Sequence, residues 1–248
     1  MNNVLINGFN GKMGQELYKA LKGQNDFNVV AGIDINTDSN MIPVYSNTED
    51  IKEDINIIID FSTPEATLNI LKYASSKNIP IVIATTGFNE EQLKIIENYS
   101  KELPIFISSN MSFEINMMLD IASKLAKQLD NADIEIIETH HRNKIDSPSG
   151  TALMLANEIN QALDNKMEYT YDRHSKREKR SDKEIGIHSI RGGTEVGKHT
   201  IMFYSDNESF ELSHTVTSRS IFANGSIKAA KFLLTQPNGL YNMKNLIK

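Results

Sequence analysis

Short apolar runs recur through the first 110 residues, and segments with helical spacing separate several of them. Apolar strands are predicted at residues 4–7, 28–34, 55–62, 79–87 and 103–108. Helices are predicted around Leu17 and Leu21, after Thr63 and Pro64, and after Asn89, where Thr and Asn suit the N-cap and Pro suits the first helical position. Strands so uniformly apolar are typical of a parallel sheet that is covered on both faces. The pattern therefore predicts a doubly wound parallel α/β sheet.

The pattern changes after residue 110. A long helix is predicted over 113–129, followed by an alternating strand over 132–137, a polar stretch and a helix to about residue 164. Further strands are predicted at 185–191, 198–204 and 210–217, and we expect them to form a sheet with 134–139. The final helix, 220–234, and the tail after 239 are expected to return to the first domain. We predict a dinucleotide-binding domain of residues 1–109 and 219–248, and an α+β domain of residues 110–218 with a mixed sheet for substrate binding and oligomerisation.

The first strand leads directly into a glycine turn. Gly8, Gly11 and Gly14 precede a helix, and glycines there let a pyrophosphate approach backbone N–H groups at the helix start. Asp34 ends the next strand, twenty residues after Gly14, where a carboxylate would bind the ribose hydroxyls of a dinucleotide. The unit thus resembles a Rossmann-like cofactor site. Ile35 follows in place of an arginine, so NADH is expected to be preferred over NADPH, although Lys12 would partly compensate.

Mostly polar residues follow the later strands of the first domain. They are Ser62, Thr85, Thr86 and Gly87, followed by Ser109, Asn110 and Met111. In a doubly wound sheet, the carboxyl ends of the strands line the cofactor crevice. Each of these residues could equally be an ordinary turn residue, so they are candidates as a group.

The polar stretch at residues 138–152 is the candidate active site. It lies on a strand-to-helix loop, a place where catalytic groups concentrate, and it contains His140, His141 and Lys144. Adjacent histidines on a strand point to opposite faces, so the two are expected to have different roles. Histidine titrates near neutral pH, which suits a general acid. Ser149-Gly150-Thr151 opens the next helix, whose N-terminus would hold a carboxylate or phosphate, so an anionic substrate is expected.

Other interpretations of these residues remain open. Paired histidines and a lysine also occur on solvated loops without a function. Zinc binding by the two histidines is disfavoured because adjacent ligands on a strand diverge and no third ligand stands at a usual spacing, so no metal is expected. The charged segment 172–183 is typical of a mobile surface loop. Alternatively, five of its basic residues would form a lid over an anionic ligand: Arg173, Lys176, Arg177, Lys179 and Arg180.

Composition narrows the range of functions. The chain has 248 residues, a formal net charge of −6 and no cysteine. The negative charge argues against broad nucleic-acid binding, and the lack of cysteine excludes a thiol nucleophile or thiolate metal site. The first residues lack the basic start and apolar length of a signal peptide, and no run approaches a membrane span, so a cytoplasmic protein without membrane contact is expected.

The stretch Glu138-Thr-His-His-Arg-Asn-Lys-Ile-Asp-Ser-Pro-Ser-Gly-Thr-Ala resembles the signature of the 4-hydroxy-tetrahydrodipicolinate reductase (dihydrodipicolinate reductase) family. The likeness spans nearly the whole chain and has several motifs in order: Gly8 to Gly14, Asp60-Phe-Ser-Thr-Pro, Ala84-Thr-Thr-Gly-Phe, Ser109-Asn-Met-Ser, Ser189-Ile-Arg-Gly-Gly, Gly197-Lys-His-Thr, and Arg219 with Phe222-Ala-Asn-Gly. The sequence departs from the family pattern at Ala84, where glycine is frequent, at Glu114, where a small residue is common, and at Ile35, where some members have arginine.

The resemblance implies roles for individual residues. His140 would be the proton donor and Lys144 its catalytic partner, while His141, Gly150 and Thr151 would bind a small dicarboxylate. Ser149, at the same helix start, is a further candidate for binding it. The nicotinamide cofactor would be surrounded by Gly8, Phe9, Asn10, Gly11, Lys12, Met13, Asp34, Ala84, Thr85, Thr86, Ser108, Ser109, Asn110 and Met111. The family also implies a place in lysine and diaminopimelate biosynthesis, and a homotetramer assembled through the second domain's sheet.

Two other classes of function stay open from the sequence. One is another two-domain nicotinamide-dependent amino-acid or hydroxy-acid dehydrogenase, with the same first domain and a different substrate pocket. The other is a regulatory protein that senses NADH without catalysis, which would leave the cluster of His140, His141 and Lys144 unexplained.

Overall fold

A computed structural model describes residues 1–129 and 131–247. It divides into two compact units, residues 1–113 with 219–248 and residues 114–218. The predicted boundary between residues 109 and 110 falls in the connection from β6 to α4. Residues 130 and 248, which belong to the two predicted domains, lie outside the described residues.

Within its described residues, the first unit contains a seven-stranded parallel sheet in the order β12-β6-β5-β4-β1-β2-β3. Its strands are β1 (Asn2–Asn7), β2 (Phe27–Ile33), β3 (Val44–Tyr45), β4 (Ile57–Asp60), β5 (Ile81–Ile83), β6 (Pro104–Ile107) and β12 (Gly239–Tyr241). Its helices are α1 (Lys12–Leu21), the 3₁₀ helix η1 (Thr48–Asp50), α2 (Pro64–Lys77), α3 (Glu90–Tyr99), α6 (Ser220–Leu233) and α7 (Met243–Leu246). The predicted doubly wound α/β sheet is confirmed.

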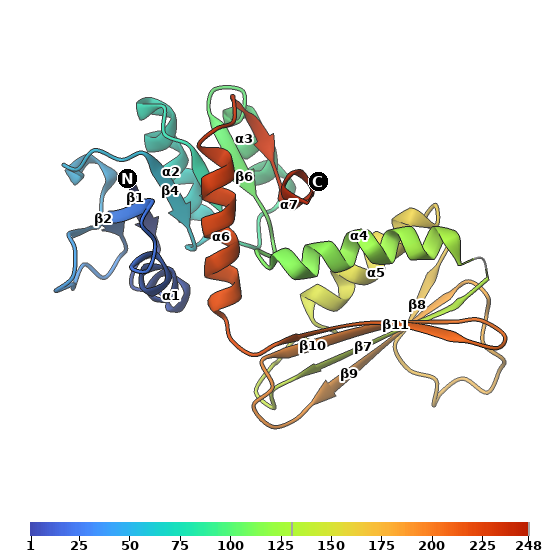
Figure 1. The fold of residues 1–248 in the computed structure, drawn as a ribbon. Helices are drawn as coiled ribbons and strands as arrows, with labels where there is room; N and C mark the ends of the chain where they lie inside the picture. The colour runs from blue at the N-terminus through green and yellow to red at the C-terminus, as the bar shows by residue number, and fades with distance from the viewer. Residues whose placement is uncertain (130, 248) are drawn as a thin grey trace. The chain divides into compact units, whose positions relative to one another are not determined.

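Both faces of this sheet are buried, because alternate residues of each strand enter different cores. On β1, Val4 and Ile6 pack in the core that contains residues of α1 and α6, whereas Leu5 packs in the core that contains residues of α2 and α3. Figure 1 shows α6 beside this sheet, although the whole second unit separates it from β6 in the sequence. As predicted, the tail returns to this unit, where β12 pairs with β6.

The predicted N-caps form. The Thr63 side chain accepts a hydrogen bond from the Ala66 N–H at the start of α2, and Pro64 occupies the first turn. Asn89 and Gln92 form a capping box at the start of α3. Each side chain satisfies N–H groups that the helix itself leaves without a partner, which is why these helices begin where the sequence indicates.

The second unit contains a mixed five-stranded sheet in the order β11-β10-β7-β9-β8, as described for residues 114–129 and 131–218. The strands are β7 (Asp133–His140), β8 (Glu168–Thr170), β9 (Glu184–Arg191), β10 (Gly197–Tyr204) and β11 (Ser209–Val216). The helices α4 (Phe113–Gln128) and α5 (Gly150–Ala162) lie on one side of the sheet (Figure 1). Their apolar residues form a core with Ile134, Ile136 and Ile201. The predicted mixed sheet is confirmed. The short strands β3 and β12 of the first unit and β8 of the second were not predicted.

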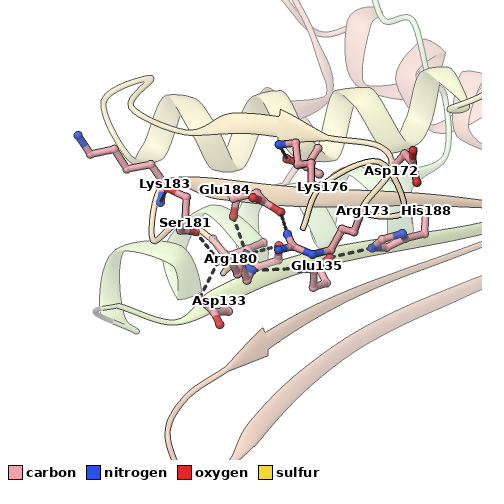
Figure 2. Close-up of polar contacts among 12 residues, drawn as sticks. Asp133, Glu135, Asp172, Arg173, Lys176, Arg180, Ser181, Lys183, Glu184 and His188 are labelled. Carbon is pink, nitrogen blue, oxygen red and sulfur yellow. Dashed lines mark hydrogen bonds and ion pairs between the residues drawn. The ribbon is translucent and has the colours of Figure 1, made fainter. Parts of the chain in front are cut away.

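The charged segment between β8 and β9 is attached to the sheet by arginines (Figure 2). Arg180 donates to Asp133 at 2.7 Å, to Glu135 at 3.1 Å, and to the backbone carbonyl oxygens of Ile134 and Glu184. Arg173 forms an ion pair with Glu184. These two of the five basic residues are therefore paired within the unit, and the suggested lid over an anionic ligand stays a prediction for the segment.

Candidate active site

Strand β7 carries two ionisable side chains into the protein interior. Its burial alternates strictly, and Ile134 and Ile136 face the core beneath α4 and α5. Because side chains two residues apart share a face, Glu138 and His140 continue the same buried row beyond the apolar residues. Glu138 is fully buried, and His140 is 8% exposed. Neighbouring His141 follows the end of the strand and is partly exposed.

The Glu138 carboxylate is held by donors from three segments. Arg191 of β9 donates to both carboxylate oxygens at 2.7 Å, and the Ser149 N–H donates to Oε1 at 3.1 Å. Nδ1 of His140 lies 2.5 Å from Oε2. Burial raises the pKa of Glu138, but the hydrogen bonds from Arg191, Ser189 and His140 outweigh it and lower the pKa to about 2. Glu138 is therefore a carboxylate at neutral pH.

A second buried histidine, His199 of β10, lies edge-on to His140, with ring centroids 5.2 Å apart. Its Nε2 atom is 3.0 Å from the Ser149 hydroxyl. Burial, with a smaller contribution from the charge of His140, lowers the pKa of His199 to about 4. Burial also lowers the pKa of His140, where the hydrogen bond and charge of Glu138 act in the opposite direction. His199 is thus neutral beside the candidate proton donor.

The loop after β7 brings a cation close to these groups. The Lys144 ammonium pairs with Asp146 at 2.8 Å, and its side chain is 21% exposed. The backbone N–H of His141 donates to the carbonyl oxygen of Glu195, and the N–H of Lys144 donates to the carbonyl oxygen of His141. Lys144 lowers the pKa of His140 through its charge, so the two side chains interact electrostatically as well as sharing a loop.

Helix α5 begins at the predicted residues. Ser149 is its N-cap, and its hydroxyl accepts a hydrogen bond from the Ala152 N–H at 3.1 Å. Gly150 and Thr151 form the first turn, and a Cβ added at Gly150 would meet no atom within 4 Å. A helix start with open space beside it is suited to a carboxylate, because the positive end of the helix dipole lies there. The structure therefore brings together in one unit all six residues predicted for catalysis and substrate binding.

The glycine turn between β1 and α1 has the shape that a dinucleotide requires. Gly8 has a φ of +80°, and a Cβ at Gly14 would lie 2.2 Å from the Gly8 carbonyl oxygen, so neither position admits a side chain without rearrangement. The N-cap residue Gly11 provides no side-chain hydrogen bond to the N-terminus of α1. Backbone N–H groups at this helix start are therefore available to an anion such as a pyrophosphate.

A cavity of about 870 Å³ adjoins this turn within the first unit. Gly8 and Asp34 line it, together with Ile35 and two acidic residues of η1, Glu49 and Asp50. The Asp34 carboxylate is oriented by the N–H groups of Asn10 and Asn36, at 2.9 and 3.1 Å. A glycine turn, an oriented carboxylate and an adjoining cavity fit the adenosine end of a dinucleotide.

Several other residues predicted to surround the cofactor have side chains that pack or form hydrogen bonds within the protein. Phe9 is fully buried against Tyr18, and Met111 is 2% exposed in the same core. The Thr85 hydroxyl donates to Asp60, and the Ser108 hydroxyl donates to the carbonyl oxygen of Asn110. Any contact of Phe9, Thr85 or Met111 with a cofactor would therefore involve mainly the backbone. The remaining candidates lie in the same unit: Lys12, Met13, Ala84, Thr86, Ser109 and Asn110.

Three residues of the buried cluster were not predicted as site residues. Glu138 was recognisable from its place in the alternation of β7, and Arg191 and His199 from the Ser189-Ile-Arg-Gly-Gly and Gly197-Lys-His-Thr motifs. The sequence alone does not show that Arg191 pairs with His140 across the strands, or that His199 reaches Ser149. Strand pairing between distant segments brings them together.

Two other kinds of site are absent from residues 1–129 and 131–247. No group of three or more His, Cys, Asp or Glu side chains there is arranged to hold a metal ion. None of the helices described is long and apolar enough to span a membrane.

Comparison with known proteins gives consistent matches over the whole chain. Residues 2–111 match the family model "Dihydrodipicolinate reductase, N-terminus", and residues 114–247 match "Dihydrodipicolinate reductase, C-terminus". The 4-hydroxy-tetrahydrodipicolinate reductase of Caldanaerobacter subterraneus subsp. tengcongensis is 50% identical over 245 residues, covering 99% of this chain and 98% of the relative. The enzyme of the same name from Clostridium tetani is 43% identical, covering 97% of this chain and 94% of the relative.

A solved structure agrees with these matches. Dipicolinate-bound dihydrodipicolinate reductase from Paenisporosarcina sp. TG-14 superposes with a TM-score of 0.83 at 27% identity, and 99% of each chain is covered. The Corynebacterium glutamicum diaminopimelate dehydrogenase structure, at 13% identity and a TM-score of 0.58, shares the fold alone. The family matches to both halves and the full-length relatives together show that this chain belongs to the dihydrodipicolinate reductase family.

Proposed function

We propose that this chain catalyses the NAD(P)H-dependent reduction of 4-hydroxy-tetrahydrodipicolinate to tetrahydrodipicolinate in lysine and diaminopimelate biosynthesis. The observation that carries the proposal is the full-length match to reductases of that name, at 50% and 43% identity. The dipicolinate-bound structural relative supports a small dicarboxylate as the substrate. The chain is accordingly an oxidoreductase.

Residues of the second unit have the catalytic and substrate-binding roles in the proposed reaction. Loss of water from the 4-hydroxy substrate gives a conjugated cyclic imine. When bound, the nicotinamide supplies a hydride to one carbon of this conjugated system. His140 donates a proton to the neighbouring carbon, and Lys144 stabilises negative charge as it develops. His141, Ser149, Gly150 and Thr151 bind the substrate carboxylates, with the N-terminus of α5 as the main anion site. The buried position of His140 and the neighbouring ammonium of Lys144 support these roles.

We assign the dinucleotide to the first unit, residues 1–109 with 219–248 in the predicted division. The glycine turn and Asp34 hold the pyrophosphate and the adenosine ribose, and the ends of β5 and β6 lie nearer the nicotinamide. NADH is the preferred cofactor. Ile35 offers no charge to a 2′-phosphate. The carboxylates of Glu49 and Asp50 line the cavity next to Asp34 and would repel a 2′-phosphate. Lys72 also lines this cavity and carries a positive charge. The reaction as proposed needs no metal.

Two further properties follow from the family and remain proposals. The chain forms a homotetramer through the five-stranded sheet of its second unit, whose face opposite the helices exposes Ile190 and Tyr204 at 51% and 41%. Its light-scattering mass is then about four times 27.9 kDa. The reaction takes place in the cytoplasm, without nucleic-acid or membrane partners.

The experiment that tests the activity is a coupled assay. Pyruvate and aspartate semialdehyde are condensed by their synthase to form the substrate, and purified protein is added with NADH or, separately, NADPH. Oxidation that requires every component, and is faster with NADH, supports the proposal. Oxidation with a different amino or hydroxy acid instead would indicate another dehydrogenase. NADH binding without oxidation of any substrate would favour a sensor.

A further inference from the structure

We propose that Nε2 of His140 carries the proton that is transferred to the substrate, and that Glu138 and Gly197 are the residues that position this atom. The inference deepens the proposed function and rests on it, because it takes His140 as the general acid. The residues that hold the ring in place all belong to the second unit.

The first observation is the environment of the opposite ring nitrogen. Nδ1 lies 2.5 Å from Oε2 of Glu138, and Glu138 is fully buried among the donors Arg191 and Ser149. An ionised carboxylate accepts hydrogen bonds and has no proton to donate. Nδ1 therefore keeps its hydrogen whether the ring is charged or neutral. The proton that His140 gains and loses must be on Nε2.

The second observation is the space next to Nε2. A Cβ added at Gly197 of β10 would lie 3.0 Å from Nε2 and 3.4 Å from Cδ2 of His140. Contacts of 3.0 Å are tighter than side chains normally tolerate, so alanine would push against the reactive side of the ring. Gly197 does not have a positive φ, so its backbone conformation does not require glycine. Glycine at this position instead leaves room for Nε2 of His140.

The third observation concerns the charges that face His140. Glu138 on β7 raises its pKa, whereas burial, Lys144 on the loop and Arg191 on β9 lower it. His199 on β10 has its own pKa lowered to about 4, so it stays neutral at neutral pH and adds little repulsion to a protonated His140. Arg191 also pairs with the carboxylate on which His140 depends. Glu138 is thus the one of these four side chains that stabilises the charged ring.

The proton-transfer step balances with these assignments. The hydride from the reduced cofactor forms a C–H bond at one carbon of the substrate C=C bond, and the π electrons of that bond move to the neighbouring carbon, where their negative charge is conjugated with the imine. The Nε2–H bond of the imidazolium then breaks as a second C–H bond forms. The ring becomes neutral with its hydrogen on Nδ1, still donated to Glu138. Solvent restores the proton on Nε2 before the next turnover.

The decisive test is nitrogen NMR of the His140 ring in the wild-type protein without substrate. We expect the neutral ring to carry its hydrogen on Nδ1, and Nε2 to be the nitrogen whose signal titrates with pH. A neutral ring with hydrogen on Nε2 would overturn the proposal. This readout does not depend on turnover. Failure of the reductase assay with the expected tautomer would reject the proposed function alone, and activity with the opposite tautomer would reject this inference alone.

Variants of Glu138 test the positioning role. E138Q removes the charge, so we expect the pKa of His140 to fall, the basic limb of the kcat profile to move to lower pH, and kcat to fall by about 10²- to 10⁴-fold, as when an orienting carboxylate is lost from a histidine. E138D keeps the charge and should restore part of the His140 pKa. The matched control is E135Q, on the opposite face of β7, which should leave the His140 titration unchanged. An unchanged titration in E138Q would contradict the proposal.

Glycine variants test the room beside Nε2 separately. G197A should lower kcat and shift the Nε2 signal while leaving the Nδ1 hydrogen bond in place. G192A is the matched control, because a Cβ at Gly192 would meet nothing within 4 Å. Wild-type kcat and ring signals in G197A would remove Gly197 from the proposal. If either Glu138 variant fails to fold, the wild-type tautomer and G197A still decide the assignment of Nε2.

Discussion

His140 and Glu138 lie two residues apart on one face of β7, with Nδ1 of the histidine 2.5 Å from Oε2 of the glutamate. The pair follows the buried apolar residues on the same face of the strand. The alternation of side chains that places those residues in the core therefore also buries the candidate acid. Burial and Glu138 have opposite effects on the pKa of His140. The strand therefore sets both the position and the acidity of the proposed proton donor.

Replacing His140 should affect chemistry more than cofactor binding. We expect H140A to lower kcat by about 10²- to 10⁴-fold, since general acid catalysis contributes rate factors of this size. NADH affinity should change only modestly, because His140 belongs to the second unit and the proposed dinucleotide site to the first. Steady-state kinetics and NADH fluorescence titration measure the two effects. H174A, at an exposed histidine, is the control, and unchanged turnover in H140A would disprove its role.

Buried His199 should make stability depend on pH. Its pKa is about 4 in the folded protein, below the ordinary histidine value of 6.5 expected for the unfolded chain, so between these values the unfolded chain binds more protons. The free energy of unfolding should therefore fall as pH decreases from 6.5 towards 4, by on the order of 3 kcal/mol from this residue. Below that range, Glu138 continues the loss as pH falls from 4.5 towards 2.

Urea unfolding of H199Q measures this contribution. Glutamine keeps a polar atom near Ser149 but does not titrate, so the slope of stability against pH between 6.5 and 4 should become shallower. H174Q, at the exposed histidine, should keep the wild-type slope. An H199Q slope equal to that of the wild type would show that His199 titrates normally in the folded protein.

Arg180 should determine how firmly the 172–183 segment is held. We expect R180A to destabilise the protein by about 1.5–3 kcal/mol, since the carboxylates of Asp133 and Glu135 and two backbone carbonyl groups lose a charged donor. R180K should recover only part of this, because lysine lacks the planar fork of donors. K179A, at the exposed neighbouring residue, should change stability by less than about 0.5 kcal/mol.

Limited trypsin digestion gives an independent readout of the same contact. Lys176, Arg177 and Lys179 lie in the exposed part of this segment. Trypsin should cleave the chain after these residues faster in R180A than in K179A, when the two variants are compared at the sites that both retain. Equal cleavage rates in R180A and the wild type would mean that Arg180 does not hold the segment.

The proposed NADH preference should be reversible at one position. We expect I35R to raise the ratio of kcat/KM for NADPH to that for NADH by about 10-fold or more, because a charged hydrogen bond to the 2′-phosphate contributes at least that much. Ile35 is 99% exposed and lines the cavity, so arginine is accommodated without loss of packing. M41R, at another exposed apolar residue outside the cavity lining, is the control. A lower KM for NADPH than for NADH in the wild type would contradict the preference itself.

Local signals accounted for most of the fold. Caps at Thr63 and Asn89 and the alternation of β7 are properties of adjacent residues, so they were readable from the sequence. The two-residue strand β3 and three-residue strand β8 are too short to show a period, and pairing with longer neighbours creates them. The candidate loop was predicted because its polar residues are contiguous.

The electrostatic partners of that loop were missed for the same physical reason. Arg191 and His199 are more than fifty residues from His140 in sequence, and the pairing of β7 with β9 and β10 brings them to it. The segment 172–183 looked like a free charged loop because the acids that pair with Arg180 lie on β7, in a different part of the sequence.

The most direct measurement of the proposed reaction follows one atom from cofactor to product. NADH carrying deuterium at the transferable position of the nicotinamide is supplied to the purified protein with 4-hydroxy-tetrahydrodipicolinate generated by its synthase, and the product is analysed by mass spectrometry. We expect tetrahydrodipicolinate with one deuterium atom for each NADH oxidised. Absence of this product, or product without cofactor-derived deuterium, would contradict the assignment of this chain as a nicotinamide-dependent reductase of that substrate.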